Sequence, residues 1–416
     1  MKFEVLKRSY LKRNIIIGVL GVAIISTVVL NFTRAKYRVT ESIPLVNGTI
    51  NYTPYDFKVI AMYQENDNGE YTSVDVMPSG GYVINEEKSY CTLDGKTKDE
   101  NAILKTIDGN HTIANLSKKS KCYLYFDELA GLTIDEILAN KVINTRTNFD
   151  NIFFSDTTGT MFEAEDNDGK TYYFAGSPRD NWVFFAGFYW RIIRINGDGS
   201  IRIIYNGTTS NSTGVNTHIQ ISTFNNNDGD NMYVGYLYEK DNVHGSSTES
   251  TIKGVVDRWY ITKIGDISKY SSKVKEDGTF CINRSLTSGS GLANDKTVYG
   301  KRNNNPSYKC ENKEDIITSP VGLISMDELW YAGGTITTDN TSFYLYNGQA
   351  YWTMSPCDFG TETQKFARVY TFQATGRING HKVTLERGVR PVINLRADVI
   401  LTGSGTTSDP YTVVET

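Results

Sequence analysis

Histidines and clustered acids are the residue types here that most often carry chemistry, and their spacing limits what they can do. None of the four histidines has a partner at the spacing of a zinc site: His111, His218, His244 and His381. Acidic clusters at 165–169 and 228–230 would attract calcium, but neither fits an EF-hand loop. Turn formation explains these clusters better. We therefore expect no metal and no cofactor.

Motifs for enzyme catalysis are missing as well. Two Gly-Lys-Thr stretches, at 95–97 and 169–171, lack the first glycine of a phosphate-binding loop. The HExxH pattern does not occur, and no nucleophile can be matched with a neighbouring base. We expect that the protein is not an enzyme.

The segment from 351 to 387 is the candidate binding surface. In the β-prone run 366–372, Ala367 and Val369 alternate with Arg368 and Tyr370, so one pair is expected to face inward and the other outward. Residues 379–382 are expected to form a turn. Aromatic and arginine side chains are frequent anchors of interfaces. An ordinary solvated strand and turn is the alternative. The candidate ligand-binding residues are Tyr351, Cys357, Asp358, Arg368, Tyr370, Asn379, His381 and Lys382.

The five cysteines favour an exported protein with disulfide bonds. No two of them form a CxxC pair, so a zinc ribbon or a thioredoxin-like motif is unsupported. We expect the pairs Cys91–Cys122, within one β-prone segment, and Cys281–Cys310, which flank a loop rich in Gly, Asn and Lys. Free buried thiols are the alternative. Cys357 is left over, beside a Ser-Pro that is expected to end a buried strand.

The N-terminal stretch 15–32 is almost unbroken in its apolar character. As a helix it would be about 27 Å long, just enough to cross a hydrocarbon core. Basic residues are more numerous before it than after it, which favours a cytoplasmic tail at 1–14 and an extracellular remainder. We expect a single-pass anchor in the cell membrane; a cleavable signal peptide is the alternative.

Composition restricts the class of the remainder. The 43 Lys+Arg and 47 Asp+Glu leave a net charge of −4, which argues against nucleic-acid binding. Ordinary hydrophobic content excludes disorder for the bulk of the chain. The 27 Tyr and 18 Phe, with only 9 Pro, favour a mostly β or α+β protein.

The pattern of elements suggests three regions after the anchor. Residues 33–127 alternate short strands and turns, with an Asn47-Gly48 hairpin signal, and suit a small immunoglobulin-like β-sandwich whose disulfide ties its sheets or a sheet edge. Residues 128–150 are expected to form a helical linker with Thr133 as its N-cap. Residues 151–416 form one larger domain. In it we expect a buried hairpin from the runs 183–195 and 201–205, and a helix near 250–260.

Several segments in order resemble a family of exported surface proteins of unknown function from Firmicutes and related gut bacteria. They are WVFFAGFYWRIIRINGDGSIRIIYNG, FCINRS, SPVGLISMDELWYAGG, YLYNGQAYWTMSP and GVRPVINLRADV. The opening segment resembles the β-sandwich that often precedes that domain. The resemblance implies a C-type lectin-like fold in its formylglycine-generating-enzyme variant for the C-terminal domain.

The resemblance also bears on the site. The EPN, QPD and WND triplets of calcium-dependent sugar binding are absent, and only Cys357 lies where formylglycine-generating enzymes carry a cysteine pair, so neither activity is implied. The same region is the variable face of proteins diversified by retroelements, which implies an exposed Cys357 at a sampled position. Arg390 is expected to be a structural ion-pairing residue.

These observations together favour an extracellular binding protein, an adhesin or receptor. Its ligand would be a protein or glycan on another surface, met by the C-terminal face of the lectin-like domain. The alternative is a structural component of the envelope or of an appendage, in which the same surface packs against copies of itself.

Overall fold

β-strands dominate the structure. The computed structural model describes residues 42–45, 48–51, 57–66, 68–78, 82–93, 95–107, 110–128, 131–149, 155–292, 295–300, 305–360 and 365–414. Strands make up 38% and helices 13%, which confirms the mostly β prediction. The predicted tail 1–14 and membrane segment 15–32 lie outside the described residues. Within the described ranges, no helix is long and apolar enough to cross a bilayer.

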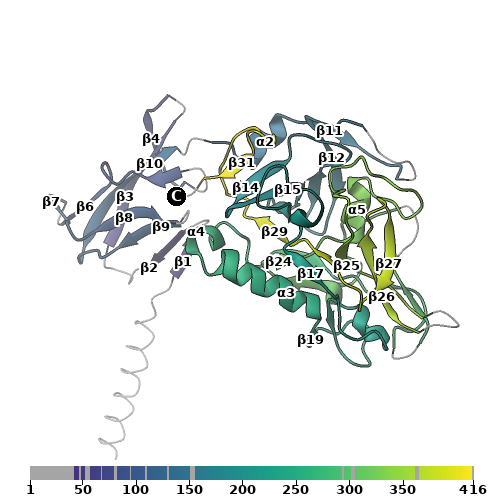
Figure 1. The fold of residues 1–416 in the computed structure, drawn as a ribbon. Helices are drawn as coiled ribbons and strands as arrows, with labels where there is room; N and C mark the ends of the chain where they lie inside the picture. Colours follow the sequence, from purple (N-terminus) through teal and green to yellow (C-terminus); the bar gives the residue numbers. More distant parts are fainter. Residues whose placement is uncertain are drawn as a thin grey trace, which may run out of the picture. The chain divides into compact units, whose positions relative to one another are not determined.

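The chain divides into two compact units, and the first of them ends at Asp127 (Figure 1). Its main sheet has six strands in the order β4-β3-β10-β6-β7, with β5 also paired to β10. β3 and β10 run parallel, whereas the pairs β3–β4 and β10–β6 are antiparallel. The strands are β3 Phe57–Glu65, β4 Tyr71–Val74, β5 Tyr82–Ile84, β6 Tyr90–Leu93, β7 Thr97–Lys98 and β10 Ser120–Glu128.

Two strand pairs complete this unit. β1 (Ser42–Leu45) pairs antiparallel with β2 (Gly48–Asn51), which confirms the hairpin predicted there. β8 (Ile103–Ile107) and β9 (Asn110–Ala114) form the second pair.

The Cys91–Cys122 disulfide is present as predicted, with an S–S distance of 2.07 Å. The two residues lie opposite each other on the neighbouring strands β6 and β10, with Cα atoms 4.0 Å apart. Both side chains are buried, together with Leu124 and Phe126 on the same face of β10. The disulfide therefore joins two strands inside one sheet, where the sequence predicted a bond between sheets or at a sheet edge.

Nearly all of the second unit follows Asp127, and it contains two large sheets. The ten-stranded sheet has the order β11-β12-β13-β15-β14-β31-β30, and β16, β29 and β24 continue from β15. Its strands are β11 Val142–Thr145, β12 Thr160–Glu165, β13 Lys170–Tyr173, β14 Trp182–Phe185, β15 Phe188–Ile195, β16 Ile201–Tyr205, β24 Val321–Gly322, β29 Val392–Leu395, β30 Leu401–Thr402 and β31 Tyr411–Val413.

The seven-stranded sheet has the order β17-β28-β25-β22-β21, with β26 paired to β25 and β27 paired to β26. Its strands are β17 Gln220–Ser222, β21 Leu286–Ser288, β22 Thr297–Tyr299, β25 Tyr351–Phe359, β26 Ala367–Phe372, β27 Ile378–Lys382 and β28 Arg387–Val389. Two separate pairs join β18 (Leu237–Tyr238) to β19 (Thr248–Glu249) and β20 (Thr279–Cys281) to β23 (Ile316–Thr318).

The predicted central hairpin is confirmed: β15 and β16 pair antiparallel, and all residues of β16 are buried. The first apolar run is two strands, however, because Ala186 and Gly187 form a turn between β14 and β15. Both have positive φ, 52° and 77°, as a type I′ hairpin requires. The sequence signal was weak because alanine rarely adopts this conformation.

The α-helices described in the second unit are short; α2 and α3 lie where the sequence predicted helices, whereas α4 and α5 were not predicted. α2 (Ile134–Ala139) begins at Thr133 with a full capping box, and its Ile134 and Ile137 belong to the core of this unit rather than to a free linker. α3 (Thr251–Tyr260) confirms the second prediction and buries one face. α4 (Ser268–Ser271) follows it, and α5 (Met326–Ala332) begins at Ser325 with another capping box.

Candidate functional site

The second unit contains a hollow of about 250 Å³ with a mostly polar lining. Its walls come from segments far apart in the sequence: the ends of β12, β15 and β16, strand β20, the loop 305–311 and the start of α5. We call it the acidic hollow. The residues that define it here are Asp166, Asp168, Arg194, Asn196, Arg202, Tyr308, Asp327 and Glu328.

Buried ion pairs hold the wall of the acidic hollow. Arg194 Nη1 lies 2.6 Å from Asp166 Oδ2, and Arg194 Nε lies 3.6 Å from Glu328 Oε1. Arg202 pairs with the same oxygen of Glu328. All four side chains are nearly or wholly buried, and removing one would leave an unpaired charge in the interior. Two carboxylates therefore balance two guanidinium groups, and this part of the wall is neutral and rigid.

Glu328 and Asp166 are also fixed by backbone amides. The Ser325 N–H donates to Glu328 Oε2 at 2.8 Å as part of the α5 capping box. Asp166 accepts from the N–H groups of Asp168, Gly169 and Gly197 at 2.9–3.1 Å. The predicted turn at 165–169 is thus confirmed, and it also positions a carboxylate in the hollow.

Asp327 also lines the acidic hollow, and none of the ion pairs among the described residues involves it. Its Oδ1 accepts a hydrogen bond from the Ser307 N–H at 3.0 Å. Burial raises the pKa of Asp327 to about 6, and the Glu328 carboxylate contributes to the rise. Partial burial, followed by repulsion from Asp166, also raises the pKa of Asp168. The lining therefore contains more acceptor capacity than its own donors use.

Two buried polar atoms in the lining have neither a hydrogen bond nor an ion pair among the described residues: Asn196 Oδ1 and the Tyr308 hydroxyl. Tyr308 is 8% exposed. An unsatisfied buried polar atom costs about 1–3 kcal/mol, so such atoms call for a partner. The lining presents both donors and acceptors for a ligand.

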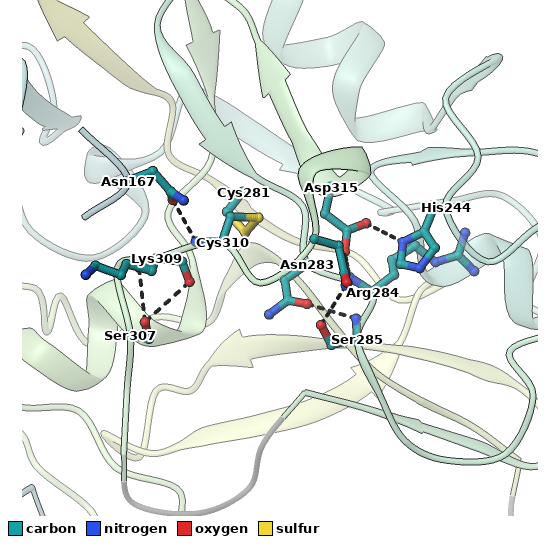
Figure 2. The surroundings of a disulfide bond; sticks show 11 residues. Asn167, His244, Cys281, Asn283, Arg284, Ser285, Ser307, Lys309, Cys310 and Asp315 are labelled. Atoms are coloured by element: carbon teal, nitrogen blue, oxygen red, sulfur yellow. Dashed lines mark hydrogen bonds and ion pairs between the residues drawn. A yellow bond between two sulfur atoms is a disulfide. The ribbon is translucent and has the colours of Figure 1, made fainter. Parts of the chain in front are cut away.

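Figure 2 shows the Cys281–Cys310 disulfide, which was also predicted. Both cysteines line the acidic hollow. The disulfide fixes the loop 305–311 to β20, with an S–S distance of 2.06 Å. The Cys310 N–H donates to Asn167 Oδ1 at 2.8 Å, and Lys309 pairs with Glu165 at 2.6 Å. The disulfide and these contacts together hold the loop that carries Ser307 and Tyr308.

The predicted binding residues lie elsewhere, and five of the eight meet around a second hollow of about 180 Å³. We call it the Cys357 hollow; its predicted members are Cys357, Asp358, Arg368, Tyr370 and Asn379. Arg368 and Asp358 form a bidentate ion pair across β25 and β26. Of the other three, Tyr351 is fully buried. His381 Nδ1 lies 3.1 Å from Thr371 Oγ1, and Lys382 Nζ lies over the Phe366 ring.

Three predictions for the segment 351–387 are wrong: the exposure of Cys357 and Tyr370, the end of the buried strand at the Ser-Pro, and the turn at 379–382. Cys357 is 3% exposed and Tyr370 is 4% exposed, because β25 and β26 are covered on both faces and alternation does not separate an outer side. Cys357 and Asp358 belong to β25, which continues through the Ser-Pro, rather than following it. Residues 379–382 lie in strand β27, not in a turn, because they pair with β26.

The remaining polar predictions have structural explanations. Arg390 is fully buried, and it donates to the carbonyls of Tyr205 and Leu345 and to Asn206 Oδ1 at 2.8–3.1 Å. The ion-pairing role predicted for it is therefore wrong. His244 Nδ1 lies 2.9 Å from Asp315 Oδ1, beside the disulfide (Figure 2).

Sequence reasoning missed the acidic hollow because its residues come from six separate segments with ordinary local roles. Asp166 reads as a turn residue, and Asp327 and Glu328 read as the first turn of a capped helix. Only Arg194 and Arg202 gave a signal, since arginines in otherwise apolar buried runs need partners.

No family model matches the chain, and neither a curated protein nor a solved structure does so. Among the described residues, no group of three His, Cys, Asp or Glu is arranged to hold a metal ion. The chemistry of the acidic hollow therefore follows from the groups that line it. Carboxylates and an amide oxygen can accept hydrogen bonds, and arginine and tyrosine groups can donate them. Such a set suits hydroxyl or amine groups.

Proposed function

We propose that the protein is a membrane-anchored extracellular binding protein that recognises a glycan of another surface in the acidic hollow. The observation that supports it most directly is that two buried polar atoms of the lining, the Tyr308 hydroxyl and Asn196 Oδ1, have no hydrogen-bond partner among the described residues. Sugar hydroxyls donate and accept at once, so they can satisfy both kinds of atom. The two disulfides support an oxidising, exported location.

The size of the hollow favours a single sugar residue or chain end over a large ligand. At about 30 Å³ for each water, its volume corresponds to roughly eight waters. The carboxylate of Asp327, fixed by the Ser307 N–H, is the acceptor best placed to distinguish a hydroxylated ligand from an apolar one.

The proposed function is compatible with the domain arrangement that the family resemblance implies. An immunoglobulin-like first unit would hold the second unit away from the membrane anchor at 15–32, and the second unit would have the C-type lectin-like fold. If its face is diversified by retroelements, variation is expected at exposed Asn379 and not at buried Cys357. Sequencing codons 357–387 across a population tests this part of the proposal.

A structural role is the second candidate, and strand β11 favours it. β11 is at the edge of the ten-stranded sheet, and all four of its residues are exposed. Val142 and Ile143 are 61% and 36% exposed, and an uncharged apolar edge strand is a template for pairing with another chain.

The test of the proposed function is binding of the full-length chain, in detergent, to arrayed glycans. The Asp327→Asn variant removes the charge of the central acceptor, and Asp266→Asn is the matched control at an exposed site outside the hollow. Binding that is lost in the first variant and retained in the second supports the hollow. Equal binding by both variants would place the ligand elsewhere.

A further inference from the structure

Lys141 and Asp180 form an ion pair in the interior of the second unit. Their side chains are 6% and 8% exposed, and the lysine lies between α2 and β11 whereas the aspartate precedes β14. Among the described ion pairs made by lysine, no other has both side chains so well buried; Lys253, for example, pairs with Asp257 that is 25% exposed. Bringing both charges out of water is expensive, so this pair needs an explanation.

The two oxygens of Asp180 have different surroundings. Oδ2 accepts from the Gly159 N–H at 2.8 Å and contacts Lys141 Nζ. Oδ1 is buried and has no hydrogen-bond partner among the described residues. An ion pair retained for stability would be expected to satisfy both oxygens.

The groups around Lys141 Nζ are largely aromatic. The Phe174 ring centre lies 6.0 Å away, and Phe174 and Tyr411 are 1% and 4% exposed. Burial raises the pKa of Tyr411, and the Lys141 ammonium acts in the opposite direction. These side chains leave little room for water around the pair. Transfer of one proton from Nζ to the carboxylate would convert the pair into a neutral amine and a carboxylic acid.

We propose that Lys141 Nζ and Asp180 Cγ condense to an amide, which crosslinks the second unit covalently. After proton transfer within the pair, the Nζ lone pair attacks Cγ, and Oδ2 becomes an oxyanion that the Gly159 N–H stabilises. The intermediate collapses, the C–Oδ1 bond breaks, and Oδ1 leaves as water with protons from the nitrogen. The Tyr411 hydroxyl, beside Nζ, relays a proton. One amide and one water form, and no oxidant or reductant is required.

Contrasting pairs in the same molecule show why the reaction is expected at this place. Lys253 contacts Glu249 and Asp257, but these carboxylates are 58% and 25% exposed, so water reaches them. Arg194 and Arg202 are buried beside Glu328, but a guanidinium stays protonated and is not a nucleophile. Lys141 combines a nucleophilic nitrogen with burial.

The experiment is peptide mapping of the folded, full-length chain after reduction and trypsin digestion. The proposal expects that trypsin does not cut after Lys141. Peptide 122–146 is then found joined to peptide 180–191, at their summed mass less one water. Free peptides 122–141, 142–146 and 180–191 as the whole signal would overturn it, because they show an ordinary ion pair.

Two controls make the result specific. The Lys141→Arg variant keeps a positive charge but must lose the joined peptide entirely. The pair Lys253–Asp257 must give no joined peptide in the same digest, since its carboxylate is hydrated. A crosslink at both pairs would contradict the role assigned to burial. The wild-type digest decides the proposal even if the variant does not fold.

Discussion

The Cα of Gly380 lies directly against the thiol of Cys357. A Cβ at position 380 would come within 2.3 Å of Cys357 Sγ and 3.1 Å of its Cβ. Because Cys357 is only 3% exposed, its thiol has little freedom to move aside. The close contact of β27 with β25 thus depends on a glycine opposite a small side chain.

Gly380→Ala should therefore destabilise the second unit by about 1–3 kcal/mol, as overpacking of a closed core does. Cys357→Ala removes Sγ and makes room, so the double variant should be less destabilised than the sum of the two single variants. Urea denaturation of the four proteins measures this coupling. Strict additivity would show that the two residues are not in contact.

The free energy of unfolding should fall as pH rises, because Asp327 loses its proton. Its folded pKa of about 6 exceeds the ordinary 3.8, so between these values the folded state binds more protons than the unfolded state. The stabilising contribution is complete below pH 3.8 and is lost by about pH 6, a loss of about 3 kcal/mol. Asp327→Asn should remove this loss, which unfolding at pH 4 and pH 7 would detect.

His218 should instead lower the free energy of unfolding as pH falls, over nearly the same pH range. Burial, with the Arg390 charge nearby, lowers the pKa of His218 to about 4 from 6.5. The unfolded state then binds the extra proton, and stability is lost as pH falls from 6.5 to 4, by about 3 kcal/mol. We expect His218→Gln to be the less acid-sensitive protein. A variant as acid-sensitive as the wild type would contradict this assignment.

The edge strand β11 offers a test of self-association. If copies pair through this edge, Ile143→Lys should abolish the concentration-dependent dimer, because a charge on an edge strand opposes pairing. Val76→Lys is the control, since Val76 is 77% exposed and lies outside β11. Sedimentation velocity over a range of concentrations measures the dimer. A dimer that survives Ile143→Lys would exclude β11 as the contact.

Local patterns predicted local structure well. The helical spacing of apolar residues in 250–260 identified α3, and the apolar runs 183–195 and 201–205 identified the β15–β16 hairpin. Cysteine spacing identified both disulfides. These features depend on residues that are close in sequence or on a small number of possible pairings.

Burial and the site itself depend on long-range packing, and there the sequence was a poor guide. The alternation around Arg368 and Tyr370 predicted an exposed face, but both faces of β26 are covered. The acidic hollow joins Asp166 to Glu328 through Arg194, residues with no shared local pattern. Only the folded sheets bring such residues together.

The most direct test of the central claim is binding of the full-length chain to its best arrayed glycan, measured by calorimetry for the wild type, Asp327→Asn and Asp266→Asn. If the glycan binds in the acidic hollow, Asp327→Asn should weaken binding at least tenfold, about 1.4 kcal/mol, because a charged acceptor is replaced by a neutral one. Asp266→Asn should bind like the wild type. Unchanged affinity in Asp327→Asn, with the protein folded, would contradict the assignment of the acidic hollow as the binding site.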